Sequence, residues 1–168
     1  MTFVERMVGA AKLSSKTYEE VEADRGASGQ ALGVVMLSSV AAGIGAGAGV
    51  RGLIVGTIAS LLGWFVWAGL IYLIGARWLP EPQTRADTGE LMRTIGFATS
   101  PGILRVVGIV PLLTPIVFTI TALWMLATMV VAVRQALDYA STGRAIVVCL
   151  IGWFVQLAFF VLLRLARG

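Results

Sequence analysis

The chain has 168 residues, of which 58% are apolar and 13% are charged, and its net charge is +4. Soluble domains carry about 45–50% apolar and about 25% charged residues, so this composition excludes a water-soluble fold. The chain has no histidine, which excludes imidazole catalysis, histidine zinc sites and histidine ligation of haem. We therefore expect a membrane protein, and we predict no catalytic residue, cofactor or metal.

Residues 1–28 form the first predicted unit, an amphipathic segment on the cytoplasmic side. Apolar residues recur at helical spacing between Phe3 and Ala11, and charged residues occupy the other faces. This pattern predicts an interfacial helix that lies on the membrane, with a frayed solvated tail as the alternative. Ser14 and Ser15 can cap a second short helix over residues 16–24.

Residues 29–168 are predicted to form an all-α polytopic transmembrane helical bundle. Four stretches carry no charge at all, namely residues 26–50, 52–76, 106–133 and 145–163. Each reaches the length of about 20 apolar residues that a helix needs to cross a bilayer. The predicted spans are about 29–50, 53–76, 88–112 (broken), 115–137 and 143–164.

The third span is the least regular of the five. Asp87 and Glu90 have the spacing of a capping box, and Ser100-Pro101 is a second helix start. An α-helix of about ten residues from this start is about 15 Å long, half of a bilayer. Two arrangements remain open. Either residues 88–112 act as one broken span, or 101–112 is a re-entrant half-helix shielded by protein.

Small residues are concentrated in the first two predicted spans. Gly43, Gly47, Gly52 and Gly56 are spaced for close approach of two helices. Lipid provides no hydrophobic drive for helix association, so small side chains that permit close packing are expected at such interfaces. We predict that these four glycines pack the first two spans as a tight antiparallel hairpin.

Basic residues gather at the ends of the spans rather than in one stripe, which argues against nucleic-acid binding. With five crossings and a cytoplasmic N-terminus, nine of the 13 basic residues and all nine acidic residues lie in the cytoplasm. This is the asymmetry that the positive-inside rule describes. We expect a multi-pass protein of the inner (plasma) membrane. If 101–112 does not cross, the C-terminal arginines return to the cytoplasm.

Two polar residues, Arg105 and Gln156, lie deep in the predicted spans and need a partner there. An arginine deep in a span costs about 2.5–3.5 kcal/mol on insertion scales. Arg105 is therefore expected either to reach the near interface or to bind a buried partner or an anionic headgroup. Gln156 needs a hydrogen-bonding neighbour, because hydrocarbon supplies none. It joins neighbouring helices or, as the alternative, lines a transport path.

Four charged residues are predicted to lie near one another at the cytoplasmic surface. Arg134 and Asp138 are four residues apart at the end of the fourth span, and Glu90 and Arg93 begin the third. We predict a charged cluster of Glu90, Arg93, Arg134 and Asp138, with a simple solvated boundary at the span ends as the alternative.

Three stretches resemble a known family. They are Tyr18–Glu22 ahead of Gly29–Ala31, then Arg93–Ala98 with Pro101, and then Ala132–Leu137 after Trp124. Over residues 14–163, the chain resembles the bacterial branch of the Yip (Ypt/Rab-interacting protein) family. The resemblance implies five spans and a cytoplasmic N-terminus. Eukaryotic members bind Rab-type GTPases, but this chain lacks the aspartate–leucine–tryptophan–glycine–proline type of motif, so that activity is not carried over.

The functional hypothesis is a membrane scaffold or adaptor that organises membrane components or serves as a subunit of a complex. Its expected partners are lipid and another membrane protein or a cytoplasmic-side protein, with a homo-oligomer as a further possibility. A subunit of a small-molecule or ion transporter or channel is the alternative. No chain of ionisable groups crosses the predicted spans, whereas pumps and proton-coupled carriers need such relays.

Overall fold

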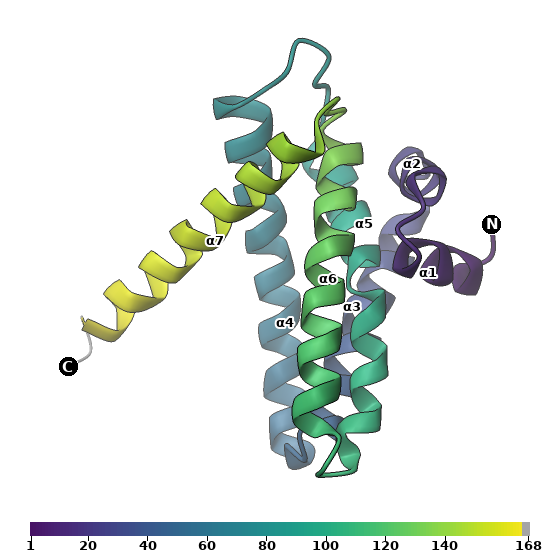
Figure 1. The fold of residues 1–168 in the computed structure, drawn as a ribbon, viewed down its shortest axis with the longest axis vertical. Coiled ribbons are helices and arrows are strands. Elements are labelled where there is room, and N and C mark those ends of the chain that lie inside the picture. The colour runs from purple at the N-terminus through teal and green to yellow at the C-terminus, as the bar shows by residue number, and fades with distance from the viewer. Residues whose placement is uncertain (166–168) are drawn as a thin grey trace.

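The computed structural model describes residues 1–165, with side chains as far as Ala158. The described chain is helical, without a strand, and most of the helices run side by side (Figure 1). The elements are α1 (Phe3–Ala11), α2 (Ser15–Ala23), α3 (Ala27–Gly45), α4 (Gly49–Ile71), the π-helix η1 (Tyr72–Trp78), α5 (Thr88–Ala98), the 3₁₀-helix η2 (Ser100–Ile109), α6 (Thr114–Ala136) and α7 (Thr142–Leu165).

The two ends of the bundle differ in chemistry. The polar end consists of residues 77–88 and 137–143, and it lies at the top of Figure 1. The bare end consists of the short turns 46–48 and 110–113, which carry no charged residue. Among the described residues, α3, the continuous helix Gly49–Trp78 and α6 are long and apolar enough to cross a membrane.

A new helix begins at Ser100-Pro101, as the sequence predicted, but its geometry differs from the expected α-helix. Residues from Ser100 form the ten-residue 3₁₀-helix η2. A 3₁₀-helix rises about 2.0 Å per residue, so η2 is about 20 Å long rather than about 15 Å. With the 11 residues of α5, the two helices reach about 36 Å. They run along α6 toward the bare end (Figure 1).

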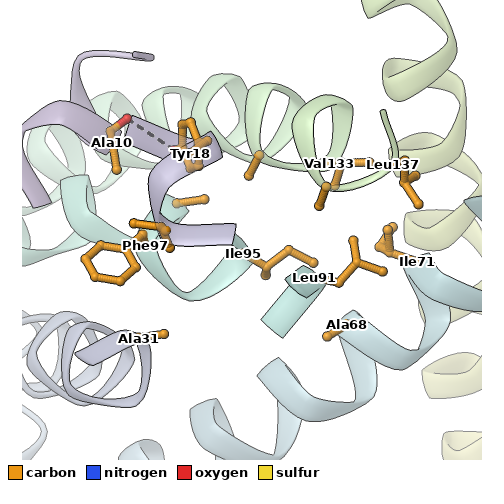
Figure 2. Packing of buried hydrophobic residues seen from close by; sticks show 14 of the residues in the cluster. Ala10, Tyr18, Ala31, Ala68, Ile71, Leu91, Ile95, Phe97, Val133 and Leu137 are labelled. Carbon is orange, nitrogen blue, oxygen red and sulfur yellow. Dashed lines mark hydrogen bonds between the residues drawn. The ribbon is translucent and has the colours of Figure 1, made fainter. Parts of the chain in front are cut away.

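The hydrophobic core surrounds α5. Leu91, Ile95 and Phe97 are buried there. In Figure 2, Leu91 and Ile95 lie below Val133 of α6, and Ile71 of α4 lies beside Leu91 in this view. These large apolar side chains are buried on several faces of α5. Their burial stabilises this short helix, because tertiary packing supplies most of a short helix's stability.

The first span ends earlier than predicted. Helix α3 stops at Gly45, and α4 begins at Gly49, where the prediction had helix to residue 50. Gly47 and Gly49 both have φ of +65°, which L side chains rarely adopt, so the chain reverses within this turn. Gly47 is therefore a turn residue and does not pack one helix against another.

The remaining predicted packing glycines have different surroundings. A Cβ on Gly43 would meet the side chain of Leu53, so Gly43 does lie at the α3–α4 contact. On Gly52, a Cβ would meet only Ala48, and at Gly56 no described atom lies within 4 Å. The α3–α4 pair is instead joined near Ser39, whose hydroxyl lies 3.3 Å from that of Thr57.

The closest helix approaches involve η2 and α5 rather than α4. A Cβ on Gly45 would collide with the backbone carbonyl of Arg105, and one on Gly102 would collide with Ser38. A Cβ on Gly96 would lie 2.8 Å from that of Ala31. Small residues thus do bring helices together here, as expected in lipid, but the partners of α3 in these approaches are η2 and α5.

The N-terminal hairpin α1–α2 is fixed to the bundle through polar contacts. Arg6 is buried, and its guanidinium donates to Glu20 (3.0 Å) and Asp24 (2.7 Å) of the second helix and to Gln30 of α3 (2.9 Å). On the other side, the Trp124 indole N–H donates to the Ala11 carbonyl at 2.7 Å. The N-terminal segment is therefore a packed helical hairpin rather than a frayed tail.

Candidate functional site at the polar end

A polar cavity lies at the polar end, between α2, the end of α6 and the loop before α5. Its volume is about 540 Å³, and we call it the acidic pocket. Its lining residues are Glu19, Glu22, Gln83, Arg134, Gln135, Asp138 and Tyr139.

The walls of the acidic pocket are tied together by hydrogen bonds. The Gln135 amide donates to Glu19 at 3.0 Å, which joins α6 to α2. Across the pocket, the Gln83 amide donates to the Asp138 carbonyl at 3.0 Å. The backbone N–H of Arg85 donates to the Asp138 carboxylate at 3.3 Å. The polar loop is thereby fixed against the turn that follows α6.

Asp138 holds an unusual backbone conformation. Its φ is +53°, and its N–H and that of Tyr139 return to the carbonyls of Gln135 and Arg134, each at 2.9 Å. This pattern is a Schellman motif, in which glycine is the usual residue at the left-handed position. A carboxylate is therefore placed in the pocket where the backbone alone would favour glycine.

Tyr139 closes the floor of the pocket. Its hydroxyl lies 2.8 Å from the carbonyl oxygens of both Gly75, in the π-helix η1, and Leu79, which follows η1. The hydroxyl has one proton to donate, which it can give to either acceptor. This contact joins the end of the Gly49–Trp78 helix to the turn that carries Asp138.

Glu22 is the electrostatically perturbed group of the pocket. Burial, together with the nearby carboxylates of Asp138 and Glu90, raises the pKa of its carboxyl to about 7, although Arg93 acts in the opposite direction. Glu22 therefore changes charge near neutral pH. Such a shift requires a desolvated carboxylate with like charges near it, which is common at functional sites.

We expect this pKa to make stability fall as pH rises. The folded protein binds more protons than the unfolded chain between the ordinary pKa of 4.5 and about 7, so the free energy of unfolding decreases through that window. The loss should be about 2 kcal/mol after allowance for partial exposure. Glu22→Gln should remove this loss and be the more stable form at pH 8, measured by unfolding in mixed micelles at pH 5 to 8. Equal pH profiles for Glu22→Gln and the wild type, with Glu19→Gln as the control, would contradict it.

The four residues of the predicted charged cluster lie near the polar end, but each bonds elsewhere. Glu90 forms a capping box with Asp87, with both hydrogen bonds at 2.8 Å, as the spacing predicted. The Arg93 side chain donates to the carbonyls of Val21 (3.2 Å) and Glu22.

Arg134, on α6, also has partners outside the predicted cluster. Its guanidinium donates to the carbonyls of Tyr139 and Ala140 and to the Thr142 hydroxyl, each at 3.2 Å. Among the residues that the structure describes, no ion pair joins Glu90, Arg93, Arg134 and Asp138 to one another. Helix ends leave carbonyls unpaired, and the two arginines satisfy those backbone groups instead.

Arg105 has a partner inside the bundle. Its Nε donates to the Thr121 hydroxyl at 3.0 Å, and its guanidinium lies 5.3 Å from the ring centroid of Phe118. The side chain is half-buried between η2 and α6. A cation over an aromatic face is favourable where water is scarce, which offsets part of the cost of this position.

Gln156 lies on α7, which diverges from the bundle toward the C-terminus (Figure 1). A Cβ on Gly152, one turn earlier, would touch Trp67 and Ile71 of α4. Residues four apart share a helix face, so Gln156 lies on the side of α7 that faces α4. Neither Gln156 nor Arg105 lines the two cavities at the polar end.

Several pocket residues did not stand out in the sequence. Glu19 and Glu22 belong to the stretch Tyr18–Glu22 that carries the family resemblance, and this was the one available signal. Gln83 lies in an irregular loop, and Gln135 has no partner in the sequence pattern. Their convergence depends on how α2 docks on α6, which neither periodicity nor local spacing indicates.

Long apolar helices, a helical bundle and a polar surface gathered at one end define a class: this is an integral membrane protein of the transmembrane helical-bundle type. A family model described as the Yip1 domain matches residues 14–163, nearly the whole chain. The chain belongs to the Yip1 domain family, which confirms the resemblance seen in the sequence. No curated protein and no solved structure matches it.

Proposed function

We propose that this protein is a non-enzymatic scaffold or adaptor of the inner (plasma) membrane that docks a partner protein at its polar end. The observation that carries the proposal is the acidic pocket, because it brings three carboxylates, Glu19, Glu22 and Asp138, to one cavity. Asp138 keeps its carboxylate at a backbone position that favours glycine, which indicates a role beyond folding.

The topology proposed for this role has five crossings, with the N-terminus and the polar end in the cytoplasm. Support comes from α5 and η2, whose combined length of about 36 Å exceeds the hydrocarbon thickness of about 30 Å. Basic residues such as Arg77, Arg85 and Arg144 at the polar end also fit the positive-inside rule.

The partner should present a basic side chain to the pocket. Arg134, the basic lining residue, uses its guanidinium on the turn that follows α6. Among the described residues, Glu19, Glu22 and Asp138 form no ion pair. A lysine or arginine from a partner would relieve the repulsion between Glu22 and Asp138 that raises the pKa of Glu22. Binding should therefore weaken at low pH and at high salt.

A crosslinking experiment in native membranes tests this proposal. A photo-reactive amino acid replaces Gln83 at the pocket or Leu112 at the bare end. We expect a protein adduct from position 83 and none from position 112. The position-83 adduct should disappear when Glu19 and Asp138 are both neutralised to glutamine and asparagine.

Three outcomes would contradict the proposal. They are adducts with lipid alone, an adduct that survives neutralisation of the carboxylates, and equal adducts from both positions. An adduct only with a second copy of the chain would replace the proposed partner with a homo-oligomer. The transporter alternative has less support, because Arg105 and Gln156 lie on different elements and line neither cavity.

A further inference from the structure

The amphipathic helix α1 lies at mid-height of the bundle, well below its polar end. Its Ala11 carbonyl accepts from Trp124, which lies ten residues along α6, about 15 Å above the bare end. At its other end, the Phe3 ring lies 3.9 Å from a Cβ built on Gly33, about 18 Å above the bare end. Both ends of α1 share one height, so the helix lies across the side of the bundle (Figure 1).

The lipid-facing surface of the bundle also has unequal heights on its two sides. On the continuous helix Gly49–Trp78, exposed apolar residues extend from Val50 at least as far as Leu73, a distance of about 34 Å. On α3, they end at Leu32, about 20 Å above Gly45. Above Leu32 the exposed residues of α3 are small or polar, as at Ser28. The apolar surface beside α1 is therefore shorter by about 14 Å.

A bilayer of uniform thickness cannot match both sides. A hydrocarbon core of about 30 Å would place α1 near the bilayer centre. The exposed charges Glu5 of α1 and Lys12, which follows α1, would then lie in hydrocarbon. Each charge at that depth costs about 2.5–3.5 kcal/mol. Thinning the bilayer costs only fractions of a kcal/mol per Å, so the lipid adapts to the protein.

We propose that this protein thins the bilayer beside its α1–α2 hairpin, and that α1 enters the leaflet on the polar side as an apolar anchor. Val4 and Val8 face outward and are 64% and 47% exposed, whereas Arg6 turns inward to its carboxylates. Leu13 is exposed at φ +62°. A leucine in that conformation is strained, and contact with acyl chains would remove its apolar side chain from water.

Two positions at equal height test the proposal. Ser28 lies 17 residues before the end of α3, and Val66 lies 17 residues after the start of α4. Both are exposed and about 25 Å above the bare end. Each is replaced by cysteine in a Cys149→Ala background, labelled with a nitroxide and reconstituted as the full chain in phosphatidylcholine vesicles with 18-carbon chains.

We expect the Ser28 label to be accessible to a water-soluble nickel chelate and the Val66 label to be accessible only to oxygen. The Val66 label also reports correct insertion of the bundle. A label in hydrocarbon at both positions would overturn the proposal, because the bilayer would then be equally thick on both sides. If both labels were accessible to the nickel chelate, the proposal would be overturned as well.

A second pair of labels locates α1 itself. The label at Val8 should be accessible to oxygen and protected from the nickel chelate, whereas the label at Lys12 should be accessible to the chelate. A Val8 label in water would show that the hairpin stands clear of the lipid, and insertion of α1 would be refuted. This result is independent of the acidic pocket, so it separates the inference from the proposed function.

Discussion

Gly45→Ala is expected to destabilise the protein by about 3 kcal/mol. The added Cβ would lie 2.9 Å from the carbonyl carbon of Arg105 and closer still to its oxygen. Because the obstacle is backbone, no side-chain rotation can relieve the collision. The 3₁₀-helix η2 would have to move away from α3, which is its main packing partner. Unfolding by sodium dodecyl sulfate in mixed micelles, followed by circular dichroism, measures the change.

Gly56→Ala is the matched control for this substitution. It makes the same chemical change in a neighbouring helix, but no described atom lies within 4 Å of the added Cβ. Alanine is the better helix former, so the control should be neutral or stabilising by up to about 1 kcal/mol. Similar losses for both variants would show that the α3–η2 contact is looser than described.

Arg93→Met is expected to cost about 2–3 kcal/mol and to release α2 from the bundle. Arg93 is only 6% exposed, and its guanidinium donates to carbonyls near the C-terminal end of α2. Methionine keeps the apolar stem but leaves the carbonyls of Val21 and Glu22 without this donor. Hydrogen exchange should accelerate over residues 15–23 and change little in α4.

Arg85→Met provides the comparison for Arg93→Met. Arg85 is an exposed arginine in the polar loop, and its loss should change stability by no more than about 0.5 kcal/mol. If Arg93→Met leaves exchange in α2 unchanged, the buried guanidinium does not hold the hairpin. If Arg85→Met has an equal effect, net charge rather than the specific contacts determines the stability.

Local signals in the sequence predicted local structure well. The capping box of Asp87 and Glu90 lies where the spacing placed it, and Ser14 caps α2. The break at Ser100-Pro101 was also visible, since a cap followed by proline restarts a helix. Its 3₁₀ geometry was not, because no residue pattern there distinguishes a rise of about 2.0 Å from one of about 1.5 Å.

The charged residues were less predictable. Spacing along the chain suggested that Arg93 and Arg134 would meet acidic partners, but both bind backbone carbonyls. Arg6 did not stand out in the sequence, yet it is buried among carboxylates from α2. An arginine has five donors, so the helix end or carboxylate that lies nearest in space determines its partners.

The sequence by itself determined the solvent of this protein, because long uncharged stretches with charges at their ends can be stable only in a bilayer. It also determined the family, through stretches that together span most of the chain. Only the tertiary structure decided which glycines touch, where the acidic pocket forms and how high α1 lies. These features depend on the packing of helices distant in the sequence, and a helical repeat specifies a face but not the neighbour that covers it.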